Sequence, residues 1–126
     1  MTPSEYQNPI LCADYSDPDI VRVGDDFFMV SSSFNHVPAL PILHSTDLVN
    51  WTIINHVMDE LPLPGYDRYQ PGKGVWAPSI RWHDGKLWVC FSTPDEGIFI
   101  CHTEDPWGEW SAPHCLREAR GWIDPC

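Results

Sequence analysis

Asp17 and Asp124 each stand directly before a proline, in short motifs that lie far apart in the sequence. Asp17 belongs to Ser16-Asp17-Pro18 and Asp124 to Ile123-Asp124-Pro125, while Trp76-Ala77-Pro78 repeats the motif without a carboxylate. When a fold brings two carboxyl groups together, one can act as a general base and the other can act on the general acid. A negative neighbour raises the pKa of a carboxylic acid and so keeps it protonated near neutral pH. The structural alternative for each aspartate is a cap on the turn that leads into a strand.

The motifs are followed by short apolar runs rich in β-forming residues, and these runs repeat. One pair of runs flanks Gly24-Asp25-Asp26, and a second pair flanks Asp84-Gly85. Such pairs predict β-hairpins, because Gly and Asp tolerate the positive φ angles that tight turns need. A third strand and a polar turn ending in Trp51 or Trp110 follow each hairpin. No segment carries a sustained helical period, so the sequence predicts an all-β fold.

The two hairpins align as copies of one unit, since Pro18 matches Pro78 and Ile20 matches Ile80. Repeated units of a few short strands are typical of the blades of a β-propeller, and about two and a half blades are expected. Their predicted ranges are about 14–57 for blade one, 58–74 for a loop, about 75–115 for blade two and 121–126 for the start of blade three. The innermost strands of a propeller begin around a central channel, so Asp17, Ala77 and Asp124 are expected to converge there. The alternative is a two-sheet sandwich, which would share the turns but not the alignment.

Four stretches of the chain carry a family resemblance. They are the run from Asn8 to Phe34, HSTDLVNW at 44–51, GVWAPSI at 74–80 and GWIDP at 121–125. Together they resemble glycoside hydrolase family 43, whose members are five-bladed β-propeller enzymes, mostly β-xylosidases and α-L-arabinofuranosidases. The resemblance covers nearly all 126 residues and is closest to the xylosidase-like members.

The resemblance implies roles for four residues. Asp17 matches the general base that deprotonates a water, and Asp124 matches the carboxylate that tunes the pKa of the general acid and orients it. Phe34 and Trp76 match aromatic residues of the sugar pocket, with core packing as the alternative. Asp19 stands where the family usually has Ser or Ala. It is a rival for the base, because residues two apart in a strand face the same side.

The family's general acid is a Glu in a motif that resembles EGP, and this chain lacks that motif. Among its six glutamates, Glu96 in Glu96-Gly97-Ile98 comes nearest. The implied enzyme hydrolyses O-glycosyl bonds of xylo-oligosaccharides or arabinose-substituted xylan with inversion, which needs two carboxyl groups roughly 6.5–9.5 Å apart. We therefore expect the chain to be an incomplete fragment that is inactive alone, because it cannot protonate the leaving group.

Two other functions stay open. The chain can be a non-catalytic carbohydrate-binding propeller fragment, or part of a propeller hydrolase of the related fructan- or arabinan-acting groups. The stretches HSTDLVNW and GVWAPSI favour the xylosidase-like enzyme over the latter. Xylose and arabinose both remain candidate sugars.

The composition argues against several other partners. A formal net charge of −11 disfavours nucleic acids and anionic membranes, which attract basic surfaces. The five cysteines show no CxxC spacing and the histidines no ligand spacing, so neither a metal nor a cofactor is expected. His36 is interpreted as a polar loop residue. The chain opens without a basic segment and an apolar stretch of the signal-peptide kind, which predicts a cytoplasmic location.

Overall fold

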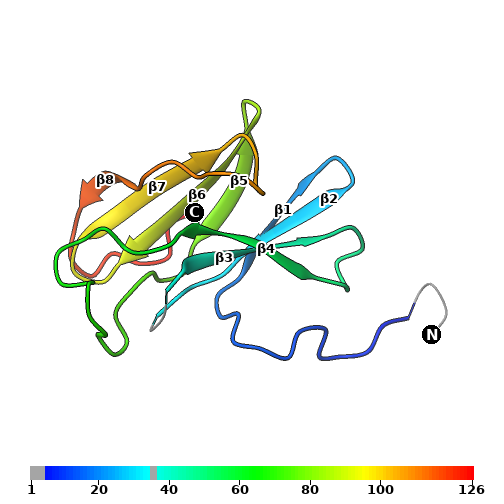
Figure 1. Ribbon diagram of the computed structural model, residues 1–126, viewed down its shortest axis with the longest axis horizontal. Coiled ribbons are helices and arrows are strands. Elements are labelled where there is room, and N and C mark those ends of the chain that lie inside the picture. Colours follow the sequence, from blue (N-terminus) through cyan, green and yellow to red (C-terminus); the bar gives the residue numbers. More distant parts are fainter. Residues whose placement is uncertain (1–4, 35–36) are drawn as a thin grey trace.

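The computed structural model of the chain, which describes residues 5–34 and 37–126, confirms the expected all-β fold. The described strands form two four-stranded antiparallel sheets, which lie side by side in Figure 1. The first sheet consists of β1 (Asp19–Val23), β2 (Asp26–Val30), β3 (Ala39–Ser45) and β4 (Thr52–Met58). The second consists of β5 (Ser79–His83), β6 (Lys86–Thr93), β7 (Gly97–Thr103) and β8 (His114–Glu118). Among the described residues, no helix is long and apolar enough to cross a membrane.

Both predicted hairpins are present. In the turn between β5 and β6, Asp84 and Gly85 have φ angles of 50° and 72°, as the tight turns favoured in hairpins require. In the turn between β1 and β2, Gly24 has a φ of 64°. The registers Val23↔Asp26 and His83↔Lys86 leave two residues in each turn. The turn residues therefore fix how the first two strands of each sheet pair, β1 with β2 and β5 with β6.

The core lies between the two sheets, where β1 packs against β5. The first sheet contributes the fully buried side chains of Val30 and Ile42, and the second contributes those of Ile80 and Phe91. The ring of Phe91 stacks on that of Phe99 with centroids 5.5 Å apart. Burial of apolar surface between neighbouring sheets is what stabilises a stack of blades.

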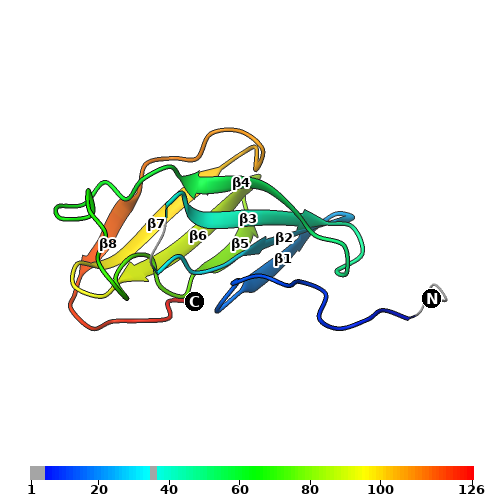
Figure 2. The ribbon, with the colours of Figure 1, turned by 60° about the horizontal axis from the view of Figure 1, so that its bottom comes forward.

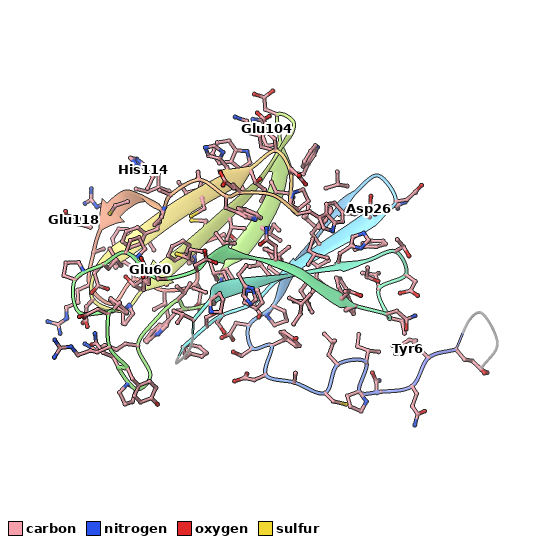
Figure 3. The ribbon with its side chains drawn as sticks, viewed as in Figure 1. Tyr6, Asp26, Glu60, Glu104, His114 and Glu118 are labelled. Carbon is pink, nitrogen blue, oxygen red and sulfur yellow. The ribbon has the colours of Figure 1, made fainter. Side chains whose placement is uncertain are left out.

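The second sheet buries only one of its faces. Along β7, residues alternate between buried and partly exposed, as expected for a strand with one face in the core. Every residue of β8 is exposed, and Figure 3 shows His114 and Glu118 on this outer strand. The partly exposed face carries apolar side chains, among them Trp88 on β6 and Ile100 on β7.

The segments that carry the candidate site residues leave both sheets at the same end of their strands; this end is called the site edge below. The pairs Asp19↔Val30 and Ala39↔Met58 place the start of β1, residues 31–34 after β2, and the end of β4 there. In the second sheet, Ser79↔Cys90 and Gly97↔Glu118 do the same for the start of β5 and the end of β8. Figure 2 shows the C-terminal segment, in red, running from β8 back toward β1 along this edge.

A bridge between the loops ties the two sheets together at the site edge. Ser33 N donates to Val75 O at 2.8 Å, and Val75 N donates back to Ser33 O at 3.0 Å. Gly74 permits this approach, because a Cβ atom there would lie 2.5 Å from Ser33 O and its φ is 132°. The loop between the sheets, residues 59–74, is therefore fixed at its C-terminal end against the end of the first hairpin.

Candidate active site

Asp17 and Asp124, which the repeat aligns, share an uncommon backbone conformation. Their φ angles are 49° and 54°, in the left-handed region that L-residues other than glycine rarely occupy. Both side chains are exposed, and each residue precedes a proline. Strained backbone of this kind costs about 1 kcal/mol or more and is concentrated at functional sites. The two carboxylates therefore have the same local geometry at equivalent places in the chain.

The three proline motifs contribute to one hollow. It has a volume of about 240 Å³ and is lined by Pro18, Asp19, Ala77, Pro78, Ser79, Arg81, Asp124, Pro125 and Cys126. Asp124 lines the hollow directly, whereas Asp17 is not among the lining residues and immediately precedes Pro18, which is. The hollow lies between the starts of β1 and β5, where a propeller would have its channel.

Ser32 holds the segment that carries Asp17, a role the sequence analysis did not assign. Its side chain is buried, and its Oγ lies 2.9 Å from Ser16 O and 3.4 Å from Asp17 Oδ2. Ser32 Oγ also lies 2.5 Å from Ser16 Oγ, and Ser32 N donates to Ser16 O at 3.1 Å. The only hint in the sequence was that Ser32 aligns with Ser92 in the repeat. Among the described residues the buried Ser92 Oγ has no hydrogen-bond partner, and its unit begins with Ala77 instead of an aspartate.

The interpretation of Asp19 as a rival base is not favoured by its contacts. Strand β1 begins at Asp19 and Asp17 has a positive φ, so the expectation that both face one side of a strand is wrong. Asp19 Oδ2 instead accepts hydrogen bonds from Ile80 N at 2.9 Å and from Arg81 Nη1 at 2.6 Å. The guanidinium of Arg81 thus balances the additional negative charge, and Asp19 joins the first strands of the two sheets.

The two predicted pocket aromatics lie together. The rings of Phe34 and Trp76 meet edge to face with centroids 6.2 Å apart, and both side chains are partly exposed. The bridge between Ser33 and Val75 brings them together, because each aromatic residue directly follows a bridge residue. Trp76 Nε1 also donates to Gly72 O at 3.2 Å. Exposed aromatic faces of this kind suit the apolar C–H faces of a sugar ring.

A second hollow, of about 250 Å³, adjoins Phe34. Most of its lining comes from the loop between the sheets, and its residues are Ser33, Phe34, Val37, Ala39, Leu61, Tyr66, Asp67, Arg68, Tyr69, Gln70, Lys73, Gly74 and Val75. His36, which the sequence predicts to be a polar loop residue, lies outside the described residues. The loop of residues 59–74 therefore forms one wall beside the aromatic pair.

The rest of the described chain offers little other site chemistry. Within residues 5–34 and 37–126, no three His, Cys, Asp or Glu side chains are close enough to hold a metal ion. Cys101 is buried, and burial raises the pKa of its thiol to about 12. Such a thiol is a poor nucleophile at neutral pH, because the reactive form is the thiolate.

Comparison with known proteins identifies the family. Residues 6–126 match the sequence profile of glycosyl hydrolases family 43. The chain belongs to this family. A putative beta-xylosidase of Xylanibacter ruminicola is 39% identical over 122 residues, which cover 96% of this chain and 22% of that protein. A non-reducing end alpha-L-arabinofuranosidase of Bacteroides ovatus is 38% identical, with 95% of this chain and 23% of that protein covered. The family 43 chain thus spans about a fifth of the length of these curated relatives.

Solved structures of family 43 proteins have the same fold. A mutant of a family 43 protein from Bacillus licheniformis superposes with a TM-score of 0.84 at 32% identity, covering 95% of this chain and 26% of that one. A family 43 protein of Bacteroides ovatus gives a TM-score of 0.77 at 38% identity, covering 86% and 22%. An alpha-L-arabinanase mutant of Cellvibrio cellulosa, with a TM-score of 0.65 at 23% identity, shares the fold.

Proposed function

We propose that this chain is part of a glycoside hydrolase that cleaves O-glycosyl bonds of xylo-oligosaccharides or arabinose-substituted xylan. The proposal is carried by the hollow that Pro18, Asp124 and Pro125 line, together with the aromatic pair of Phe34 and Trp76. Trp76 immediately precedes Ala77, which also lines this hollow. The family relatives add support, because they are named as xylosidases and arabinofuranosidases. These names favour a hydrolase over the alternative of a non-catalytic carbohydrate-binding fragment.

In the proposed reaction, Asp17 is the general base. An ionised aspartate accepts a proton from the attacking water, and its exposed position before Pro18 leaves it open to the solvent. The hydrogen bonds between Ser32 and Ser16 hold the backbone that carries it. The reaction inverts the anomeric centre, since the water attacks from the side opposite the leaving group.

Asp124 is proposed to act on the general acid. A carboxylate near that acid raises its pKa and keeps it protonated until the leaving oxygen takes the proton. We propose that the acid is a glutamate outside these 126 residues, because none of the chain's glutamates stands before Gly-Pro. The share of its relatives that the chain covers, 22% of the Xylanibacter ruminicola protein, is compatible with this division.

The test is hydrolysis of an aryl β-xyloside and an aryl α-L-arabinofuranoside. The 126-residue chain and the protein from its whole coding sequence are assayed in parallel, and proton NMR follows the anomer released first. We expect turnover by the longer protein only, with release of the inverted anomer. Asp17→Asn should lower kcat by at least about a hundredfold, and Asp25→Asn, in the exposed turn between β1 and β2, should not. Turnover of neither glycoside would refute the proposed activity, and turnover by the short chain that depends on Asp17 would refute an external acid.

A further inference from the structure

We propose that Asp95 is a positioning residue of the candidate active site, because its carboxylate joins the segment that carries Trp76 to the segment that carries Asp124. This inference rests on the proposed function, which gives those two residues their importance. Asp95 lies in the turn between β6 and β7, residues 94–96, at the site edge. Its carboxylate binds one basic side chain on each side, Lys73 and Arg120.

The first partner is Lys73, at the end of the loop between the sheets. Lys73 Nζ donates to Asp95 Oδ2 at 2.5 Å. Three residues later comes Trp76, whose indole donates to Gly72 O and whose backbone N donates to Ser92 O at 2.9 Å. Lys73 and Trp76 therefore lie on the same short segment. The ion pair between Lys73 and Asp95 fixes that segment against the second sheet.

The second partner is Arg120, on the segment that follows β8. Arg120 Nε donates to Asp95 Oδ1 at 3.1 Å, so the two oxygens of one carboxylate serve two segments. The backbone of the same turn adds two contacts. Ala119 N donates to Glu96 O at 3.2 Å, and Gly121 N donates to Pro94 O at 3.0 Å. This segment leads directly to Asp124, in the left-handed conformation that needs support from its surroundings.

The turn itself is held firmly, which a positioning role requires. Gly97 follows it with a φ of 143°, and a Cβ atom there would lie 2.0 Å from Arg117 O on β8. Tyr66 Oη donates to Glu96 Oε2 at 3.0 Å and so attaches the loop between the sheets to the turn a second time. Burial and this hydrogen bond raise the pKa of Tyr66 above its ordinary value, so the phenol remains a donor.

Of the two basic partners of Asp95, which together we call the junction, Lys73 binds its carboxylate more strongly than Arg120. The hydrogen bond from Lys73, together with the charges of Lys73 and Arg120, lowers the pKa of Asp95, which is therefore ionised at neutral pH. The side chains of Asp95 and Lys73 are 27% and 44% exposed, whereas that of Arg120 is 83% exposed. Solvent screens an exposed pair more than a partly buried one. The segment of Trp76 should therefore depend on Asp95 more than the segment of Asp124.

The experiment follows the two segments separately by NMR of the 126-residue chain without ligand. The probes are the indole N–H of Trp76 and the backbone amide of Asp124. Asp95→Ala should shift both signals, Lys73→Ala mainly the indole and Arg120→Ala mainly the amide. Asp95→Glu, which keeps the charge, should restore part of the parent spectrum. Asp25→Ala is the matched control, because it removes another aspartate paired with an arginine from a hairpin turn.

Addition of xylose to the same samples gives a second readout. We expect Asp95→Ala and Lys73→Ala to raise the Kd for xylose by about tenfold, and Asp25→Ala to leave it unchanged. If both probe signals stay at their parent positions in Asp95→Ala, Asp95 does not position the site and the inference is wrong. If Asp95→Ala does not fold, unshifted probes in both Lys73→Ala and Arg120→Ala would overturn the inference in the same way. Shifted probes in a protein that binds no xylose would count against the proposed function and not against the junction.

Discussion

At the scale of single residues, Ser32 and Ser31 are neighbours with opposite hydrogen-bonding states. Both side chains are buried, but Ser32 Oγ is bonded to Ser16, whereas Ser31 Oγ has no partner among the described residues. A buried hydroxyl that makes its hydrogen bonds contributes about 1 kcal/mol, and one that makes none costs free energy. The two serines therefore form a matched pair for measuring how firmly the segment before β1 is held.

We predict that Ser32→Ala lowers the free energy of unfolding by about 1 kcal/mol, and that Ser31→Ala leaves it unchanged or raises it. Urea unfolding monitored by tryptophan fluorescence measures both. The same substitution at adjacent buried positions controls for the change in size and polarity. Equal destabilisation by the two variants would mean that the contacts of Ser32 with Ser16 do not hold the segment that carries Asp17.

At the scale of elements, the turn between β3 and β4 is built around one carboxylate. Asp47 accepts hydrogen bonds from Asn50 N at 2.7 Å, from Asn50 Nδ2 at 2.7 Å and from Val49 N at 2.9 Å. Ser45 Oγ donates to Asp47 as well, at 3.0 Å. These bonds, those of Asn50 above all, hold the pKa of Asp47 far below its ordinary value of 3.8. Carboxylates in such turns are best stabilised when ionised.

The lowered pKa of Asp47 predicts how this turn responds to acid. A group whose pKa is depressed by folding contributes stability above its unfolded pKa and loses it as the pH falls toward the folded value. We expect Asp47→Asn to destabilise the chain at neutral pH, with the difference from the parent shrinking below about pH 4. Urea midpoints measured across that range test this, with Asp25→Asn as a control in the turn between β1 and β2. A difference that is constant with pH would contradict it.

The elements also show why part of the structure was predictable from the sequence. The hairpins depend on residues adjacent in sequence, such as Asp84-Gly85, so local turn chemistry predicts them. The contact between Phe34 and Trp76 depends on which loops meet, and the family resemblance predicted only that each is a pocket aromatic, not that they touch. Asp19 and Asp95 bind residues that lie 22 to 62 positions away in the chain, and no local sequence pattern reveals such contacts.

At the scale of the whole molecule, the described chain leaves one face of the second sheet only partly buried. Its partly exposed residues on β6 and β7 include Trp88, Cys90, Ile98 and Ile100. In a stack of blades, such a face is buried by the next blade, and an uncovered apolar face promotes association. The 126-residue chain on its own is therefore expected to hide this face against another copy.

We predict that the isolated chain self-associates through this face. Sedimentation should give a mass that rises above 14.4 kDa as the concentration increases. Ile100→Lys should shift the equilibrium toward the monomer, because a charge on the shared face must be desolvated in the associated form. Leu116→Lys adds the same charge on the exposed strand β8 and should leave the equilibrium unchanged. A chain that stays monomeric throughout, or an Ile100→Lys variant that associates like the parent, would show that the face does not drive association.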